Sequence, residues 1–257
     1  MIVLKSASEL EKMHRAGLIV WDVLNSLRQR VAPGVTTLDL ERFAARRTAE
    51  YGARAAFKGY RGFPCTLCTS VNNEVVHGIP SARRTLREGD VLSIDYGVEL
   101  DGYYADAAIT IPVGRVAPEV ERLIAATREA LDRAIAQMRP GNRLSDVGAA
   151  VQQTVEPLGF SVVREFVGHG IGTQMHEEPQ LPNYGPPGKG PRLEPGLVLA
   201  IEPMVAAGRP EVRVLDDGWT AVTADGSLAA HFEHTVAVTQ NGPWILTRPK
   251  ELSGPSW

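Results

Sequence analysis

Four acidic residues occupy matching positions in two strand-like stretches of this sequence. Asp95 ends a Leu-Ser-Ile-Asp run, and Glu202 ends a Leu-Ala-Ile-Glu run. Asp106 and Glu233 each open a following run rich in β-branched and small apolar residues. Because a carboxylate is costly to bury without a partner, acids in such runs indicate a site. Asp106 taken alone could still be a surface acid on a hairpin.

The first acidic pair can be placed from its turn. Asp101-Gly102 is a strong signal for a two-residue hairpin. That turn sets Asp95 opposite Ala108 and sets Asp106 two positions further along the same face. The two carboxylates are then diagonal neighbours with backbones roughly 7–8 Å apart. At that separation they repel each other unless a proton or a cation intervenes.

A histidine and two further acids complete the expected metal site. If the second pair repeats the first, four carboxylates converge, and their charge requires about two divalent cations. His169, flanked by Gly168 and Gly170, has room to reach a metal and lets backbone approach closely. This oxygen-rich set with one nitrogen suits manganese, iron(II) or cobalt(II), and zinc less obviously. Two metals bridged by water predict hydrolase chemistry with a hydroxide nucleophile.

The elements that must position these side chains occur twice along the chain. Two helix-period stretches are each followed by Pro-Gly, and the two Pro-Gly pairs lie 107 residues apart. The second helices, 38–51 and 144–158, and the strand-like runs repeat at the same offset, with about twenty extra residues around 205–226. We therefore expect an α+β fold in one catalytic domain, residues 1–257, with pseudo-symmetric halves of roughly 1–114 and 115–257. An accidental likeness of two α+β halves is the alternative.

Composition excludes several other classes of protein. The 257 residues carry a net charge of −3 and include two cysteines, which argues against a phosphate-backbone binder and against a disulfide framework. No apolar stretch approaches the roughly 18 residues of a membrane span. We expect a cytoplasmic globular protein with no direct nucleic-acid or membrane binding.

Seven short motifs together resemble the type I methionine aminopeptidases, which have the duplicated pita-bread fold. The resemblance extends from about residue 6 to residue 247, without the N-terminal zinc-finger region of longer relatives. The motifs are Val75-Val76-His77-Gly78-Ile79-Pro80, Ser93-Ile94-Asp95, Ala105-Asp106, Gly168-His169-Gly170-Ile171-Gly172, Met175-His176-Glu177-Glu178-Pro179, Ile201-Glu202-Pro203-Met204 and Phe232-Glu233-His234-Thr235.

The resemblance implies a ligand set and a cofactor. Asp95, Asp106, His169, Glu202 and Glu233 match the family's five metal ligands for two divalent ions: cobalt, manganese or iron(II), with zinc as a further option. By the same resemblance, Asp106 and Glu233 bridge both metals, and Asp95 also helps hold the α-amine of the substrate.

The resemblance also implies catalytic and substrate-binding roles. His176 matches the histidine at the scissile carbonyl and its oxyanion, His77 matches the one near the scissile amide nitrogen, and Glu202 matches the proposed proton shuttle. The alternatives are a surface residue for His176, a loop residue for His77 and a pure ligand for Glu202.

The methionine pocket follows in the same way. Four residues match its lining in the family: Tyr60, Phe63, Cys68 and Trp219. Core packing is the alternative for the aromatic residues. The sequence departs from a common pattern at Phe57, where a small residue often occurs, and at Met175, which is often aromatic.

The implied function is hydrolysis of the bond after the initiator methionine of nascent proteins when the second residue is small. The expected partners are nascent N-termini, with the ribosome as a further candidate, and a monomer is the expected state. Two other functions stay open. One is a proline-specific peptidase on the same fold, although such chains usually carry a large N-terminal domain. The other is an inactive binding module, although such modules lose metal ligands.

Overall fold

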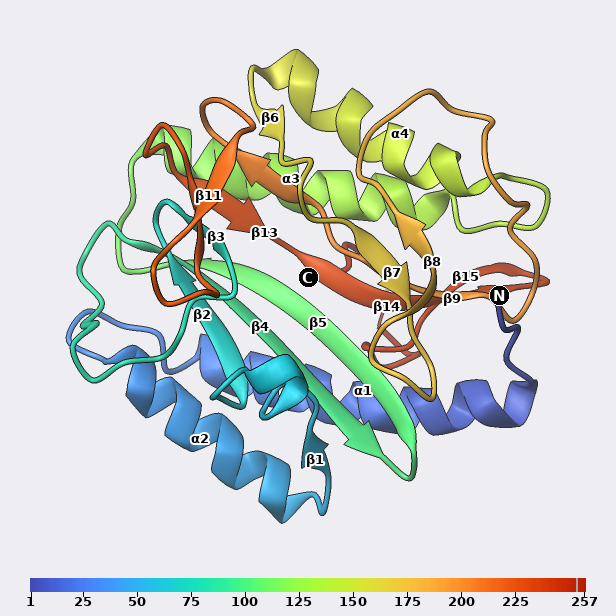
Figure 1. The fold of residues 1–257 in the computed structure, drawn as a ribbon, viewed down its shortest axis with the longest axis horizontal. Coiled ribbons are helices and arrows are strands. Elements are labelled where there is room, and N and C mark those ends of the chain that lie inside the picture. Colours follow the sequence, from blue (N-terminus) through green and yellow to red (C-terminus); the bar gives the residue numbers. More distant parts are fainter. Residues whose placement is uncertain (253) are drawn as a thin grey trace.

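The computed structural model describes residues 1–252 and 254–257, and its long helices form two pairs (Figure 1). Capping boxes begin the first pair: Ser6 precedes one helix and pairs with Glu9 in its first turn, and Thr36 precedes the other and pairs with Asp39, as expected at helix N-termini. The helices are α1 (Ala7–Arg28), α2 (Thr37–Glu50), α3 (Pro118–Ala136) and α4 (Leu144–Val155), with 3-10 turns at Tyr60–Gly62 and Glu156–Leu158. The predicted C-terminal stops are confirmed, since Gly52 and Gly159 have φ of 65° and 85°.

The strands form one large antiparallel sheet and two small ones. The nine-stranded sheet has the order β1-β4-β5-β14-β9-β7-β8, with β2 paired to β4 and β15 paired to β14. The small sheets are β13-β10-β6 and β11-β12-β3. The strands are β1 (Arg54–Ala55), β2 (Leu67–Val71), β3 (Glu74–Val76), β4 (Val91–Leu100), β5 (Tyr103–Pro112), β6 (Ser161–Val162), β7 (Gly168–Gly170), β8 (Glu177–Leu181), β9 (Val198–Ile201), β10 (Met204–Ala206), β11 (Val212–Val214), β12 (Ala221–Thr223), β13 (Ala229–His231), β14 (Glu233–Thr239) and β15 (Gly242–Ile245).

The predicted hairpin is confirmed in type and register. β4 and β5 are joined by Asp101 and Gly102, whose φ values of 52° and 82° are those of the turn that favours Asp-Gly. Asp95 pairs with Ala108, and Gly97 pairs with Asp106. The turn chemistry therefore determines which side chains of this hairpin share a face.

The helices cover one face of the large sheet, and the core lies between the helices and this face. In Figure 1, α1 passes behind β4 and β5, and α3 passes behind β13. The buried core contains the apolar faces of α1 and α3 together with the inward residues of β4, β5, β9 and β14. None of the helices in the described part of the chain is long and apolar enough to cross a membrane.

The extra residues of the second half have a structural use. β11 and β12 form a hairpin in this stretch, and β12 pairs with β3 of the first half. Trp219 lies on the connection before β12, and His77 follows β3 directly. The insertion therefore brings Trp219 and His77 to the same side of the molecule.

Three segments differ from what their residue types alone would indicate. The valine-rich stretch 161–167 forms a strand only at Ser161–Val162. β9 ends at Ile201, so Glu202, the end of the predicted strand-like run, lies just beyond its strand, because Pro203 has no N–H to continue the ladder. His14 on α1 is buried and bonds through Nδ1 to the carbonyl of Leu246 at 2.8 Å.

Candidate active site

Three neighbouring strands place two of the predicted acids in one row. Ala108 on β5 pairs with Asp95 on β4 and with Glu233 on β14. Residues paired across neighbouring strands point to the same face, so Asp95 and Glu233 stand on either side of a small alanine. The first half and the second half of the chain meet at this β5–β14 seam.

Asp106 lies next to that row, held by Thr235 of β14. Thr235 Oγ1 donates to Asp106 Oδ1 at 3.0 Å and accepts from the Asp106 backbone N–H at 3.1 Å. On the other side of Asp106, Gly97 leaves space. A Cβ at Gly97 would lie 3.1 Å from the Asp106 Cβ and 3.0 Å from Phe57. Asp106 is therefore fixed by a contact between residues 129 positions apart.

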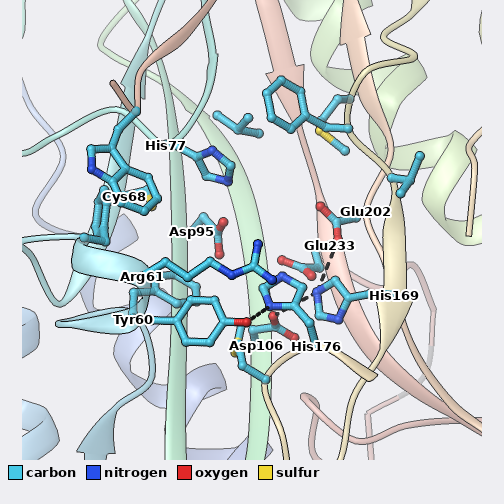
Figure 2. Close-up of a pocket in the computed structure, with 18 of the residues that line it drawn as sticks. Tyr60, Arg61, Cys68, His77, Asp95, Asp106, His169, His176, Glu202 and Glu233 are labelled. Carbon is cyan, nitrogen blue, oxygen red and sulfur yellow. Dashed lines mark hydrogen bonds and ion pairs between the residues drawn. The ribbon is translucent and has the colours of Figure 1, made fainter. Parts of the chain in front are cut away.

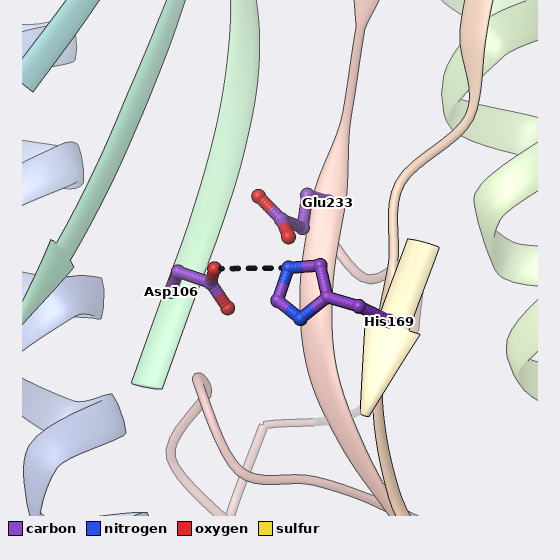
Figure 3. Close-up of side chains that lie close together, drawn as sticks. All are labelled: Asp106, His169 and Glu233. Atoms are coloured by element: carbon purple, nitrogen blue, oxygen red, sulfur yellow. Dashed lines mark ion pairs between the residues drawn. The ribbon is translucent and has the colours of Figure 1, made fainter. Parts of the chain in front are cut away.

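His169 reaches the acids from β7. Its Nδ1 bonds to the carbonyl oxygen of Gly170 at 2.8 Å. Because a carbonyl only accepts, Nδ1 carries the proton in the neutral ring and Nε2 is bare. Nε2 lies 3.4 Å from Glu202 Oε1 and 3.7 Å from Asp106 Oδ2. Figure 3 shows His169 directed at Asp106 and Glu233, and one ligand atom from each of these three residues lies within 4.8 Å of the others.

The flanking glycines have one of the two roles predicted for them. A Cβ at Gly168 would lie 2.4 Å from the Ala200 carbonyl oxygen, and one at Gly170 would lie 2.3 Å from that of Glu178. These glycines therefore allow close approach of the sheet backbone, the second of the two reasons predicted for them, and no contact shows that they make room for the imidazole.

The electrostatics of the cluster are unfavourable without a cation. Burial and neighbouring carboxylates raise the pKa of Asp95, of Glu202 and of Glu233 well above the usual values. Burial raises the pKa of Asp106 to about 6, and burial lowers the pKa of His169 to about 4. The buried Oδ1 of Asp95 has no hydrogen-bond partner among the described residues.

The donor set fits a divalent metal centre. The bare Nε2 of His169 faces carboxylate oxygens of Glu202 and Asp106, so acceptors oppose acceptors unless a cation or a proton lies between them. The Nδ1–H bond to a backbone carbonyl is the arrangement that orients metal-binding histidines. Oxygen ligands with one imidazole suit first-row divalent ions.

A second histidine stands beside the first. His176 Nδ1 is hydrogen-bonded to Tyr60 Oη at 2.8 Å, and the two rings stack at 5.3 Å. Its ring lies 4.2 Å from that of His169, and its pKa is lowered to about 4, chiefly by burial. His77 has a left-handed φ of 61° and meets the rings of Phe166 and Trp219 edge-on. Burial lowers the pKa of His77. Both histidines are therefore neutral at pH 7.

One cavity of about 380 Å³ brings all these side chains together. Figure 2 shows them around it, with Cys68 and His77 on one side and His169 on the other. All eleven residues predicted to form the site line this cavity: Tyr60, Phe63, Cys68, His77, Asp95, Asp106, His169, His176, Glu202, Trp219 and Glu233. Phe57 and Met175 line it as well, so both departures from the family pattern fall on the cavity wall.

Sequence reasoning missed other residues of the wall. Arg61, Glu165, Phe166 and Gln180 line the cavity, and none lies in a motif that drew attention. Arg61 was detectable in principle because it lies between Tyr60 and Phe63. His231, the last residue of β13, does not line the cavity but is buried with Nε2 at 3.9 Å from Glu202 Oε2.

A curled antiparallel sheet with a buried carboxylate–histidine cluster and an adjoining apolar slot fits a metal-dependent hydrolase. Comparison with known proteins identifies the family. Residues 11–240 match the metallopeptidase family M24. The chain belongs to this family.

The matched relatives agree with the resemblance found in the motifs. The chain is 51% identical over 247 residues to a methionine aminopeptidase of Clostridium acetobutylicum, covering 96% of this chain and 99% of the relative. It is 50% identical to methionine aminopeptidase 1 of Bacillus subtilis, covering 96% and 100%. The crystal structure of the Thermotoga maritima methionine aminopeptidase superposes with a TM-score of 0.95 at 48% identity, covering 97% and 100%. The predicted family and pita-bread fold are confirmed.

For a proline-specific peptidase, the comparison shows a likeness of fold alone. The prolidase of Pyrococcus furiosus superposes with a TM-score of 0.77 at 21% identity, and the match covers 97% of this chain but 66% of the prolidase.

Proposed function

We propose that this protein is a metal-dependent aminopeptidase that removes the N-terminal methionine from peptides and new proteins whose second residue is small. The observation that carries this proposal is one cavity in which the acid–histidine cluster adjoins an apolar slot containing sulfur. A thioether side chain matches such a slot. The relatives named methionine aminopeptidase, at about 50% identity over nearly the whole chain, support it.

The metal ligands in this proposal are Asp95, Asp106, His169, Glu202 and Glu233. They would hold two divalent ions, cobalt, manganese or iron(II), with zinc as a further option. When bound, such ions polarise the scissile carbonyl and make a water nucleophilic near neutral pH. Asp95, whose Oδ1 has no hydrogen-bond partner among the described residues, would also accept a hydrogen bond from the α-amine.

The remaining polar groups would handle the reacting amide. Neutral His176 would hydrogen-bond the carbonyl oxygen as it gains charge, while its Nδ1 stays bonded to Tyr60. His77 would face the scissile nitrogen. Glu202 would accept a proton from the attacking water and pass it to the leaving amine.

Phe63, Cys68, Trp219 and Tyr60 would enclose the methionine side chain, together with Phe57 and Met175. Phe63 and Trp219 meet edge to face at 5.2 Å, which gives the slot a rigid wall. Because Phe57 and Met175 also form the wall, they would set how large a first residue is accepted.

We further propose that residues 1–257 act as one catalytic domain and that the protein works as a monomer in the cytoplasm, on N-termini emerging from the ribosome. The proline-specific alternative has the fold likeness alone in its favour. The inactive alternative is disfavoured because this chain has all five residues that match the metal ligands of the family.

The test compares Met-Ala-Ser with Ala-Pro-Ala, using metal-free protein and adding manganese, cobalt, iron(II) or zinc in turn. We expect metal-dependent release of methionine from the first peptide only. Glu202→Gln and His176→Ala should lower kcat by about 10²- to 10⁴-fold, whereas the exposed acid change Glu88→Gln should not.

Two outcomes would contradict the proposal. Release of alanine from Ala-Pro-Ala would favour the proline-specific alternative. Absence of hydrolysis by protein shown to contain metal would favour a binding role.

A further inference from the structure

A second cavity, of about 550 Å³, lies beside the candidate active site at the β8 end of the nine-stranded sheet. The two cavities share five wall residues: Arg61, Val167, His169, His176 and Gln180. Of these, we place His176 at the scissile carbonyl and His169 among the metal ligands. A peptide whose first side chain fills the slot therefore has the second cavity as a path for its later residues.

Arg61 supplies a positive charge to the shared wall. Within residues 1–252 and 254–257, no carboxylate oxygen lies within 4.0 Å of its guanidinium, and no hydrogen bond engages it. The acid nearest in sequence to His176 is already neutralised, because Glu177 forms a 2.6 Å ion pair with the buried Lys5. The guanidinium of Arg61 is therefore free to bind an anion that enters the cavity.

The backbone and an aromatic ring direct the Arg61 side chain. Arg61 has a φ of 49°, a left-handed conformation costly for a residue with a Cβ. Its guanidinium lies 5.4 Å from the centre of the Tyr60 ring, which stacks on His176. In Figure 2 the Arg61 side chain extends past Tyr60 toward His176. The positive charge of Arg61 also contributes to the lowered pKa of His176.

The position of this charge relative to a substrate follows from chain geometry. In an extended peptide each residue advances by at most about 3.3–3.6 Å. The second residue of the substrate would sit at the scissile bond, beside His176. The third and fourth residues are then the ones that pass the shared wall and Arg61.

We propose that Arg61 selects peptide substrates with a carboxylate side chain at their third or fourth residue. This inference rests on the proposed aminopeptidase function and names a substrate class for it. The carboxylate binds the guanidinium at the junction of the two cavities, beyond the reacting bond. Arg61 is a specificity-determining residue in this proposal.

The test uses C-terminally amidated peptides, so that an aspartate side chain is the only carboxylate of each substrate. Met-Ala-Asp-Ser is compared with Met-Ala-Asn-Ser. A second comparison sets aspartate against asparagine at the fourth residue. We expect kcat/KM to favour the aspartate peptide by about two- to fivefold at one position, mainly through KM, as for a partly exposed ion pair. The preference should shrink as salt is raised.

Variants separate Arg61 from general effects. Arg61→Gln should abolish the preference, Arg61→Lys should keep part of it, and Arg61→Glu should reverse it. Arg83→Glu makes the same charge change at an exposed position on the turn between β3 and β4, outside both cavities, and should leave the preference intact. Thermal unfolding of each variant checks that it is folded.

Equal kcat/KM for aspartate and asparagine peptides in the unmodified protein, or a preference unchanged in Arg61→Glu, would overturn the inference. Binding of reduced-amide analogues, in which CH2–NH replaces the scissile amide, is measured in parallel by calorimetry. If the aspartate analogue binds more tightly but no peptide is hydrolysed, the proposed function fails while the role of Arg61 stands. If the peptides are hydrolysed but aspartate gives no preference, the proposed function stands and the role of Arg61 is wrong.

Discussion

The indole nitrogen of Trp257 donates a hydrogen bond to the backbone carbonyl oxygen of Glu233 at 3.2 Å. The same ring stacks between Trp21 and His234, at centroid distances of 4.9 Å and 4.4 Å. Because side chains alternate along a strand, His234 and Trp257 lie on the face of β14 opposite the Glu233 carboxylate. The end of the described chain thus supports the strand behind a predicted metal ligand.

Removing this support should destabilise the protein. Trp257→Ala loses two stacked contacts and a hydrogen bond, worth about 1.5–3 kcal/mol together. We expect the melting temperature to fall by about 4–10 °C, and by less in Trp257→Phe, which keeps an aromatic ring. Leu252→Ala, at a side chain 48% exposed, is the control, and an equal fall in that variant would argue against the stacking.

Metal should stabilise the folded protein strongly. Ligand at a hundred times its dissociation constant adds about 2.7 kcal/mol, or about 5–10 °C in melting temperature for a chain of this size. Asp95→Asn should melt higher than the unmodified protein when both are metal-free, because one repelling carboxylate is lost. The same variant should lose most of the rise caused by added manganese or cobalt. Thermal unfolding with and without a chelator measures both effects.

Buried histidines should make the protein sensitive to acid. Burial lowers the pKa of His231 and of His234 to about 3, so the unfolded chain binds protons that the fold excludes. The contribution of each histidine to stability is therefore present above pH 6.5 and is lost as the pH drops toward 3, by about 1.4 kcal/mol per pH unit. The buried acids, whose pKa values are raised, contribute with the opposite sign in the metal-free protein.

Urea unfolding of the unmodified protein and of His231→Asn, both metal-free, between pH 7.5 and pH 5 tests this prediction. The difference in unfolding free energy between the two proteins should change by about one histidine's contribution over this range, because the acids contribute equally to both. An unchanged difference would mean that His231 takes up its proton without cost in the folded state.

Lys5 and Glu177 should behave as a buried pair. Their side chains are 2% and 13% exposed, and Glu177 also accepts hydrogen bonds from the backbone N–H groups of Thr173 and Gln174. Lys5→Met leaves this carboxylate uncompensated, at a cost of about 3–5 kcal/mol. The turn before His176 should loosen as well, which lowers kcat.

A double-mutant cycle with Glu177→Gln measures the coupling between the two side chains. The exposed pair Lys250 and Glu11, at 47% and 60% exposure, is the matched control and should give at most about 1 kcal/mol. Similar coupling in both pairs would show that burial adds nothing here.

The apolar slot should determine selectivity for methionine. Trp219→Ala removes one wall, and losing part of the 1.5–3 kcal/mol from burying a methionine side chain should lower kcat/KM for Met-Ala-Ser about tenfold or more. Phe57→Ala enlarges the slot and should raise the rate on a peptide that begins with phenylalanine relative to methionine. Competition between the two peptides measures this ratio, and a ratio equal to that of the unmodified protein would place Phe57 outside the selective wall.

Several features were predictable because their causes are local. The capping residues Ser6 and Thr36 lie within three positions of their partners, and the Asp101-Gly102 turn alone determines the pairing of Asp95 with Ala108. The motifs around the acids and histidines carried the family resemblance, which the comparisons confirmed. Their roles as ligands and catalytic groups stay predictions, for which the measurements above are designed.

Other features could not be predicted because they depend on contacts between distant residues. His14 bonds to the carbonyl of Leu246, 232 positions away, and its place on a helix gives no sign of that partner. Arg61 was overlooked because exposed arginines are common, and its significance comes from two cavities whose walls also contain residues more than a hundred positions further along the chain.

The sequence by itself determined the helix caps, the hairpin register and the apolar faces, because these follow from the preferences of neighbouring residues. The tertiary structure decided that β5 pairs with β14, which sets Glu233 opposite Ala108, and that β7 brings His169 beside Ala200. Pairing of strands so distant in sequence depends on the packing of the whole core, which no local pattern encodes. Five side chains that are scattered over 139 positions thereby come to line one cavity.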